Sequence, residues 1–409
     1  MKKYALVGAG SRALHMFAEP IVKELHKHAA LVGVYDANLL RAERLSRDCG
    51  GIPVFPTFEK MLSQSGADQI IVASVDYTHD DYIIRSMEAG FDVISEKPMT
   101  TDYRKCNAVL EAERRTGRKV TVTFNARFTA YTTRIKELLK QKAIGDILSI
   151  DMEWMLDTSH GADYFRRWHR YLNKSGGLLV HKATHHFDLI NWWLEEDPVE
   201  LYAFGDLRFY GPTREQRGKR CLACAYKTSC EFYLDLEQDS FFKNYYLQAE
   251  SADGYYRDGC VFAEDIDIYD TMSVNVKYTR GTLFSYSLNA HSPYEGWKLS
   301  INGTEGRIEA RQFSSGLEKE VPESKLSLFN RRGEEVTYRM AKNTGFHGGA
   351  DEALRRMLFV GDMPDPLGHM AGSRAGAMSL LIGDAANISI AEKRPVRLQD
   401  LISRDGIRV

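Results

Sequence analysis

The amino-acid sequence lacks any apolar run that approaches the roughly 20 residues a membrane-spanning helix needs. It also lacks an excess of charge, because 54 basic and 56 acidic residues give a formal net charge of -2. An almost neutral chain gives no reason to expect nucleic acid or a membrane surface as a partner. Cysteine is scarce as well, with six residues in the chain. In a reducing compartment we expect these cysteines as thiols or metal ligands, and not as disulfides.

The first residues do not have the pattern of a secretory signal. The apolar stretch after Met1 is short, and Gly8, Gly10 and Arg12 interrupt it. A cytoplasmic protein is therefore the expectation. The length of 409 residues exceeds what one ordinary hydrophobic core accommodates and favours two domains. We predict an α/β domain over residues 1–124 and a second domain over residues 125–409.

A glycine-rich segment near the N-terminus indicates a nucleotide site. Residues 4–7 are apolar and run into Gly8-Ala9-Gly10-Ser11-Arg12, a pattern typical of a buried strand that turns into a helix. Gly8 would permit the tight turn, and Gly10 would let the backbone approach a pyrophosphate. The free N–H groups at the start of the helix would face the phosphates.

Asp36 bears on which dinucleotide binds. It follows a second apolar strand, residues 30–35, where a carboxylate accepts hydrogen bonds from a ribose 2′-hydroxyl and repels a 2′-phosphate. This position favours NAD over NADP. The alternative is that Asp36 caps the next helix. Arg12 or Arg41 could still accommodate a 2′-phosphate, so NADP stays open as the cofactor.

Further strands over residues 68–74, 91–95 and 119–124 alternate with helical segments. This alternation predicts a doubly wound parallel sheet of the Rossmann type, with right-handed crossovers. Ligands of such sheets bind outside the carboxyl ends of the strands. The glycine and polar residues at or just after these ends form the predicted cofactor site: Gly8, Gly10, Ser11, Arg12, Asp36, Arg41, Ser74, His79, Glu96, Lys97 and Asn125.

Five motifs give the chain a resemblance to the Gfo/Idh/MocA family of glucose–fructose oxidoreductases and inositol dehydrogenases. In order they are Gly8-Ala9-Gly10, residues 74–79, Glu96-Lys97-Pro98, Asn125-Ala126-Arg127-Phe128 and the segment from Gly176-Gly177 through His185 to Asp188. The resemblance covers nearly the whole chain. It implies that the second domain is α+β with a large, mostly antiparallel sheet, and that the protein is a homo-oligomer. It also implies reversible oxidation of a sugar or polyol hydroxyl.

Carried over from this resemblance, Lys97 is the motif lysine and His185 the catalytic histidine. The family usually has an aspartate four residues before that histidine, whereas this chain has His181. On a helix over residues 181–194, His181 and His185 would share one face. We predict His185 as general acid/base, Lys97 as its electrostatic partner and His181 as a substrate contact. Hydride would pass between a nicotinamide cofactor and a sugar or polyol.

Three other functions remain open from the sequence. On the same scaffold, the protein could be a glycoside hydrolase that oxidises its substrate transiently with NAD and has no net redox change. It could also be a non-catalytic protein that binds a sugar and a nucleotide. Finally, His181 and His185 are spaced like a zinc pair with Asp188 as a third ligand, as in a metal-dependent hydrolase.

A segment over residues 207–262 has the character of an insertion in the second domain. It is dense in aromatic residues and longer than an ordinary loop. Four cysteines lie within it, at a spacing that predicts a structural zinc site. Free thiols and an iron–sulfur cluster are the alternatives. The four residues are Cys221, Cys224, Cys230 and Cys260.

Overall fold

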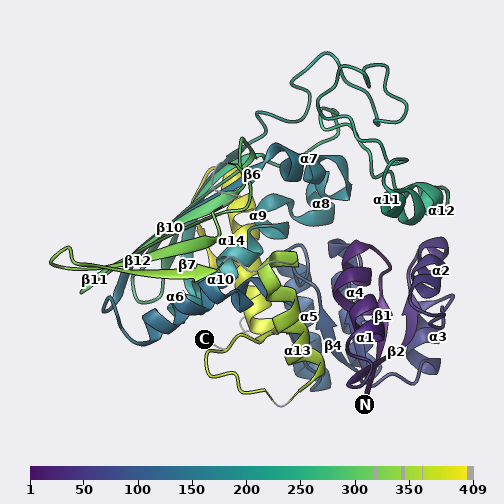
Figure 1. Ribbon diagram of the computed structural model, residues 1–409, viewed down its shortest axis with the longest axis horizontal. Helices are drawn as coiled ribbons and strands as arrows, with labels where there is room; N and C mark the ends of the chain where they lie inside the picture. Colours follow the sequence, from purple (N-terminus) through teal and green to yellow (C-terminus); the bar gives the residue numbers. More distant parts are fainter. Residues whose placement is uncertain (317–320, 342–345, 362, 403–409) are drawn as a thin grey trace.

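The computed structural model describes residues 1–316, 321–341, 346–361 and 363–402. Two sheets organise these residues, one of six strands and one of nine. In Figure 1 the six-stranded sheet lies with the N-terminus on the right, and the nine-stranded sheet spreads out on the left. Both expected fold classes are confirmed, an α/β unit at the N-terminus followed by a unit with a mostly antiparallel sheet.

The six-stranded sheet has the strand order β14-β5-β4-β3-β1-β2. All neighbouring strands are parallel except β14, which pairs with β5 in the antiparallel sense. The central strands are buried on both faces, because helices cover each side. The strands are β1 (Lys2–Val7), β2 (Ala29–Tyr35), β3 (Gln69–Val72), β4 (Asp92–Ser95), β5 (Val120–Val122) and β14 (Ala371–Gly372).

Local capping signals fix the helices between these strands. The Thr57 side chain accepts a hydrogen bond from the Lys60 N–H at 3.2 Å and caps α3. Helix α5 begins after Asp102 and ends at Gly117, which has a left-handed φ of 69°. The helices are η1 (Ala13–Ala18), α1 (Glu19–Lys23), α2 (Leu39–Asp48), α3 (Phe58–Gln64), η2 (Asp76–Thr78), α4 (His79–Glu88) and α5 (Tyr103–Thr116).

The nine-stranded sheet has the order β13-β12-β11-β10-β6-β9-β8-β7-β15. Only the β6–β9 pair is parallel among the described pairs. Buried and exposed residues alternate along β8 and β9, so one face packs on the core. The strands are β6 (Ile147–Asp157), β7 (Pro198–Asp206), β8 (Thr271–Tyr278), β9 (Leu283–Ser292), β10 (Gly296–Gly303), β11 (Gly306–Phe313), β12 (Glu323–Asn330), β13 (Glu335–Ala341) and β15 (Val396–Arg397).

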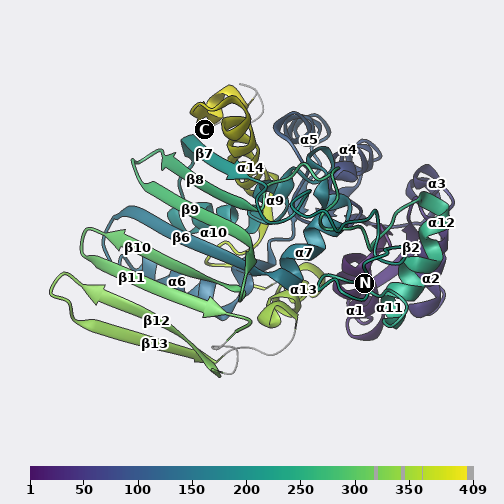
Figure 2. The same ribbon diagram turned by 90° about the horizontal axis from the view of Figure 1, so that it is seen from above.

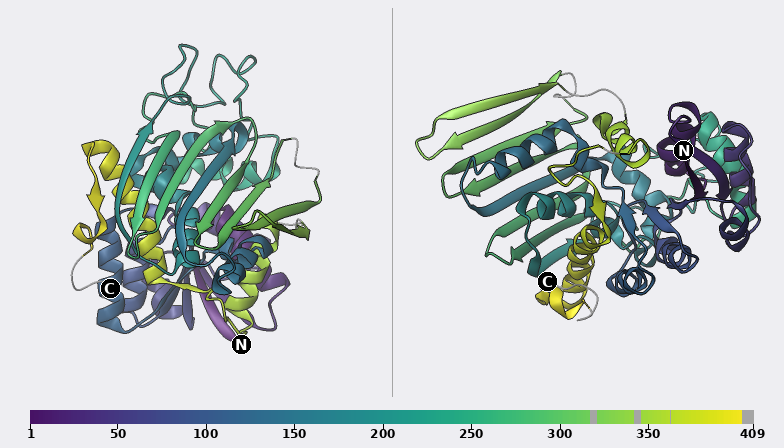
Figure 3. Two further views of the ribbon diagram at one scale, coloured as in Figure 1. Left: turned by 90° about the vertical axis from the view of Figure 1, so that its left-hand side faces the viewer. Right: turned by 90° about the horizontal axis from the view of Figure 1, so that it is seen from below.

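Helices cover the buried face of this sheet, with α6, α10 and α14 seen against it on the right of Figure 3. Helix α14 packs on both α10 and β7. Within the described part of the chain, no helix is long and apolar enough to cross a membrane. The helices are η3 (Asn125–Phe128), α6 (Ala130–Lys140), α7 (Thr158–Arg166), η4 (Trp168–Arg170), α8 (Leu172–Ser175), α9 (Gly177–His181), α10 (Thr184–Leu194), η6 (Phe346–Gly349), α13 (Ala350–Phe359), α14 (Ser373–Glu392) and η7 (Leu398–Asp400).

The aromatic-rich segment connects β7 to β8 and carries only short helices, α11 (Ser240–Tyr245), η5 (Leu247–Ala249) and α12 (Glu250–Asp253). It leaves the nine-stranded sheet and crosses to the six-stranded one. In Figures 1 and 2, α11 and α12 lie beside α2. Parts of the chain that are about 200 residues apart in sequence therefore meet above the N-terminal domain.

Candidate active site

A cleft of about 1790 Å³ opens at the carboxyl ends of the first sheet. The walls come from the loops of this sheet, from α7 to α10, and from the insertion. Every residue predicted to bind the cofactor lines this cleft, and so do all of the predicted catalytic residues. The edge where parallel strands end is the place where such sheets bind ligands.

The glycine loop at the floor of the cleft has the shape of a phosphate cradle. Gly8 has a φ of 104°, and a Cβ there would lie 2.4 Å from the Ala73 carbonyl oxygen, so only glycine fits. The Leu14 N–H donates to the Gly10 carbonyl at 3.0 Å and begins the helical segment. The Ser11 N–H donates to the Tyr246 hydroxyl of the insertion at 3.1 Å. This N–H stands at a helix start, where an anionic ligand is favoured.

Asp36 lies beside this loop and not at a helix cap. Its carboxylate accepts hydrogen bonds from the Ala9 and Asn38 N–H groups, each at 2.7 Å. The cap of α2 is instead Asn38, which accepts from the Arg41 N–H at 3.2 Å. The capping alternative for Asp36 is therefore wrong. Arg41 itself faces carboxylates, 3.6 Å from Asp36 and 2.9 Å from Asp253.

Arg12 is also held by acidic side chains. It donates to Glu96 at 2.8 Å and to Asp351 at 2.8 Å. Asp351, on α13, further accepts from the Asn125 amide at 2.7 Å. Asp351, which the sequence analysis missed, thus joins Arg12 to Asn125, and Arg12 in turn contacts the motif glutamate. No local pattern could have indicated Asp351, because it is more than 200 residues away from its partners.

Ser74 and His79 shape the loop after β3. The Ser74 hydroxyl contacts the Thr78 hydroxyl at 2.8 Å. The fully buried His79 ring lies 2.9 Å from the Pro98 carbonyl oxygen and 3.2 Å from that of Ser74. Burial lowers the pKa of His79, which favours its neutral form. His79 therefore joins the β3 loop to the segment that carries Lys97.

Lys97 and two neighbours form the charged centre of the cleft. The Lys97 ammonium donates to the His181 carbonyl oxygen at 3.0 Å. The His181 Nδ1 lies 2.5 Å from the Asp76 carboxylate. Burial lowers the pKa of Lys97 to about 8, and Asp76 opposes that shift. Burial also lowers the pKa of His181 well below its usual value and raises that of Asp76. Burial thus disfavours the charged form of all three side chains.

Asp76 is a residue that the sequence analysis did not select, although it lies within the 74–79 motif. The carboxylate is buried and stands directly against His181. His181 stands where the resemblance places an aspartate, and burial lowers the pKa of His181 well below its usual value. Asp76 therefore brings a carboxyl group from the N-terminal half to the position where the family pattern has an acidic residue.

The predicted helix over residues 181–194 is interrupted. Helix α9 ends at His181 and α10 begins at Thr184, so the two histidines do not share a regular helical face. His185 stands in the first turn of α10 and lines the cleft, with its ring centroid 6.1 Å from that of Phe124. At the break the Ala183 N–H donates to the Leu178 carbonyl at 2.8 Å, five residues back, so the regular hydrogen-bond pattern of α9 does not continue into α10.

The zinc-pair interpretation of His181, His185 and Asp188 is not supported. Both Asp188 oxygens accept hydrogen bonds from Arg127, at 2.7 and 2.6 Å, and the carboxylate is fully buried. Over residues 1–316, 321–341, 346–361 and 363–402, no three His, Cys, Asp or Glu side chains are grouped so that they could hold a metal ion. Asp188 instead joins α10 to the segment after β5.

The four cysteines of the insertion line a separate small cavity of about 20 Å³. No disulfide joins them, and they are not grouped so that they could hold a metal ion, so the predicted zinc site and the iron–sulfur alternative are not supported. The spacing predicted that the four residues lie near one another, but not that their side chains fail to group as ligands. Cys221 Sγ accepts from the Arg166 guanidinium at 3.4 Å, and burial raises the pKa of this thiol. The raised pKa favours the thiol of Cys221 over the thiolate, which is the form that binds a metal.

Residues 240–253 of the insertion, which we call the strap, lie against α2 at the edge of the cleft. The Asn38 amide donates to the Ala249 carbonyl at 2.8 Å, in a buried position. Arg41 donates to Asp253 at 2.9 Å. Tyr245 and Tyr246 are buried in the same apolar cluster as β1 and η1. The strap thus contributes Tyr246 and Asp253 to the wall of the cleft from outside the first sheet.

Comparison with known proteins identifies the scaffold. A family model described as oxidoreductase family, NAD-binding Rossmann fold, matches residues 2–124. The model described as the C-terminal alpha/beta domain of this oxidoreductase family matches residues 136–398. A protein of Bacillus subtilis (strain 168), named as the oxidoreductase YteT, is 39% identical over 430 residues, with 100% of both chains covered.

More distant proteins share parts of the sequence or the fold. Inositol 2-dehydrogenase 4 of Saccharopolyspora erythraea is 29% identical over 204 residues, covering 48% of this chain and 54% of its own. The WlbA dehydrogenase of Bordetella pertussis, solved with NADH and UDP-GlcNAcA, has a TM-score of 0.66 at 17% identity, over 97% of this chain and 98% of its own. Both halves of the sequence match one family, and the cleft lies at the nucleotide-binding edge. The chain belongs to the Gfo/Idh/MocA family of NAD-binding oxidoreductases.

Proposed function

We propose that the protein is a dehydrogenase that transfers hydride between NAD and a hydroxyl group of a sugar or polyol. The observation that carries this proposal is that Lys97, His181 and His185 all line the cleft that the glycine loop enters. Sugar and cyclitol substrates are named for relatives such as inositol 2-dehydrogenase. Such a substrate fits a cleft with several polar groups and one ionisable centre.

The residues of the N-terminal half fit the dinucleotide. Gly8 and Gly10 would allow close approach of the pyrophosphate, and the Ser11 N–H would hold the Tyr246 hydroxyl beside it. Asp36 would accept from the adenosine ribose, and Arg12 and Arg41 already face carboxylates. This charge distribution supports NAD in preference to NADP. When bound, the nicotinamide supplies or accepts the hydride.

His185 acts as the general base when a hydroxyl is oxidised. It takes the proton from the hydroxyl oxygen as hydride leaves the carbon that bears this hydroxyl, and a carbonyl group results. The Lys97 ammonium stabilises the negative charge that develops on the oxygen, and in the reverse direction it polarises the carbonyl. The neutral His181 orients the hydroxyl, and Asp76 holds the His181 ring through its Nδ1 contact.

A panel of sugars and polyols, assayed with NAD and with NADP at 340 nm, tests this function. Lys97→Met and His185→Ala should each reduce kcat by at least about 100-fold, the usual contribution of acid–base or oxyanion groups. Nucleotide affinity, measured by NADH fluorescence, should stay within a few-fold of wild type in His185→Ala. Wild-type turnover in either variant would remove that residue from the mechanism.

The strap favours a second reaction type on the same scaffold. It encloses the adenosine side through buried contacts with Asn38 and Arg41. A cofactor held in this way suits transient oxidation followed by re-reduction, as in an NAD-dependent glycoside hydrolase. Stoichiometric nucleotide after purification, together with glycoside cleavage and no net NADH, would favour this reaction over the dehydrogenase. Ready exchange of NAD with net NADH formation would exclude it.

A further inference from the structure

Two arginines that line the cleft stand out because they share a single carboxylate. Arg167 follows α7, and Arg257 belongs to the insertion. Asp163 lies 2.6 Å from Arg167 and 3.5 Å from Arg257. Although burial opposes it, the pKa of Asp163 lies below its usual value because both guanidiniums stand nearby. One negative charge therefore faces two positive charges at this point.

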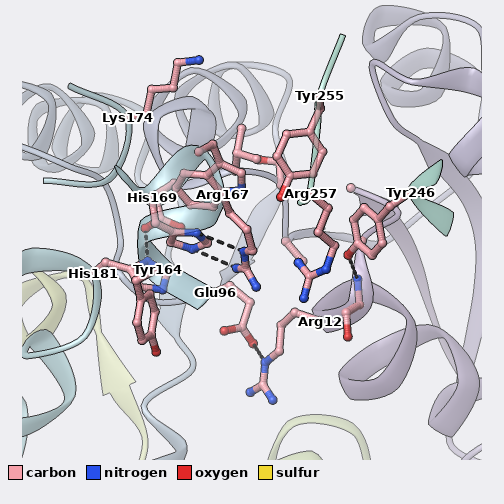
Figure 4. A pocket seen from close by; sticks show the side chains of 18 of the residues that line it. Arg12, Glu96, Tyr164, Arg167, His169, Lys174, His181, Tyr246, Tyr255 and Arg257 are labelled. Carbon is pink, nitrogen blue, oxygen red and sulfur yellow. Dashed lines mark hydrogen bonds and ion pairs between the residues drawn. The ribbon is translucent and has the colours of Figure 1, made fainter. Parts of the chain in front are cut away.

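Arg257 is buried without a full set of partners. The residue is 7% exposed, and its Nε has no hydrogen-bond partner in the described structure. The guanidinium stacks on the rings of Phe242 and Tyr246, at 4.5 and 4.7 Å from their centroids. Figure 4 shows Arg167 and Arg257 side by side, both directed into the cleft. Leaving a buried donor unpaired destabilises the folded protein, so such a donor indicates a place where a ligand can supply the acceptor.

The position of the pair relates it to the substrate and not only to the nucleotide. Arg167 contacts the His169 ring at 3.1 and 3.2 Å. The His169 ring in turn packs against His181, with centroids 4.2 Å apart. Burial lowers the pKa of His169 well below its usual value, so this ring adds no further charge. Arg167 thus adjoins the wall that carries His181, and Arg257 reaches the same place through the carboxylate that it shares with Arg167.

We propose that Arg167 and Arg257 together bind an anionic group, a carboxylate or a phosphate, of the carbohydrate substrate. This inference rests on the proposed dehydrogenase function and specifies its substrate class as an acidic sugar, such as a hexuronate or a sugar phosphate. The planar guanidinium fork matches carboxylate and phosphate oxygens in a bidentate manner. A second anion would balance the charge that Asp163 leaves uncompensated and would give the Arg257 Nε an acceptor.

Matched pairs of sugars test the proposal by binding alone. D-galacturonate against D-galactose, and glucose 6-phosphate against glucose, differ in one anionic group. Calorimetric titration of the NADH-loaded enzyme should show about 10–100-fold tighter binding of an acidic member than of its neutral partner, as charge-assisted hydrogen bonds imply. If neither acid shows saturable binding, or if the neutral partners bind as tightly, the proposal is refuted.

Arg257→Gln should reduce that preference to less than about three-fold and leave the affinity of the neutral sugar unchanged. Arg167→Lys, which keeps the charge but loses the fork, should give an intermediate preference. Arg208→Gln is the matched control, because Arg208 is 74% exposed and lies outside the cleft. Thermal melting confirms folding of each variant. If Arg257→Gln does not fold, Arg167→Lys decides the question.

The cofactor pyrophosphate is the other anion near these residues, and NADH titration distinguishes it. If Arg257→Gln weakens NADH binding while the preference for acids persists, the arginines serve the nucleotide and the proposal fails. Failure of the proposed dehydrogenase function has a different outcome. In that case the acidic sugar binds through the arginines, but no sugar in the panel supports hydride transfer.

Discussion

Replacing Asp76 by asparagine tests how the buried charges in the cleft depend on one another. Asp76 and Lys97 are both buried, and each offsets part of the cost of the other's charge. Burial lowers the pKa of Lys97 to about 8 with this carboxylate present. Asparagine keeps the shape and an oxygen that can face His181, but it removes the negative charge. A nearby opposite charge shifts a pKa by about 1–3 units, so the pKa of Lys97 should fall below about 7.

The assay is the pH dependence of kcat/KM for alcohol oxidation, which reports ionisations of the free enzyme. If the ammonium form of Lys97 is the active one, the wild-type rate falls as pH rises through about 8. In Asp76→Asn the same loss should occur about 1–3 pH units lower. Asp81→Asn is the control, because Asp81 is 58% exposed on α4 and does not line the cleft. Its profile should match that of the wild type.

Two results would refute this reasoning. An unchanged profile in Asp76→Asn would mean that the aspartate is protonated in the native enzyme or does not influence Lys97. A wild-type rate that rises through pH 8 would instead make the neutral amine of Lys97 the base. Either outcome requires a different division of roles between Lys97 and His185.

Three further predictions concern other contacts. Asp188→Asn should lower the free energy of unfolding by about 3–5 kcal/mol in denaturant titrations, because it leaves the buried Arg127 charge unpaired. Tyr246→Phe removes the hydroxyl that accepts from the Ser11 N–H, and NADH release in stopped-flow displacement should become about 2–10-fold faster. Asp36→Ser removes the charge that repels a 2′-phosphate, so the preference for NAD over NADP in kcat/KM should fall by about 10–100-fold.

Each of these predictions has a contradicting outcome. Wild-type stability of Asp188→Asn would mean that the buried ion pair is not held in solution. Slower NADH release from Tyr246→Phe would show that the hydroxyl competes with the nucleotide for the Ser11 N–H. An unchanged cofactor preference in Asp36→Ser would mean that Asp36 does not face the ribose.

Local sequence patterns were sufficient to predict most of the helices and strands of the N-terminal domain. The cap at Thr57 and the helix from Asp102 to Gly117 follow from side chains within a few residues of each helix end. The placement of Gly8 and Lys97 at strand ends follows from the alternation of strands and helices. These features depend on neighbouring residues, which is why the sequence predicts them.

The remaining contacts join residues far apart in the chain, and no periodicity encodes them. Asp76 meets His181 across 105 positions, and Tyr246 meets Ser11 across 235. The cysteines show the opposite limit: their spacing predicts that they lie near one another, as they do in one small cavity, but it does not determine whether their side chains group as metal ligands. The domain boundary at residue 124, the oligomeric state and the roles of the site residues stay predictions.

The short strand β14 has a consequence for how the N-terminal unit forms. Residues 371–372 pair with Val122 and Thr121 and add an outer strand to a sheet that is otherwise made from the first 122 residues. During synthesis on the ribosome, the N–H and C=O groups on that side of β5 therefore have no strand to pair with until more than 240 further residues have been added. A fragment that stops at Phe124 would expose this unprotected edge, and unprotected edges promote aggregation. Expression of the nucleotide-binding half by itself should accordingly give a protein that aggregates, unless β14 and α14 are supplied as a separate segment.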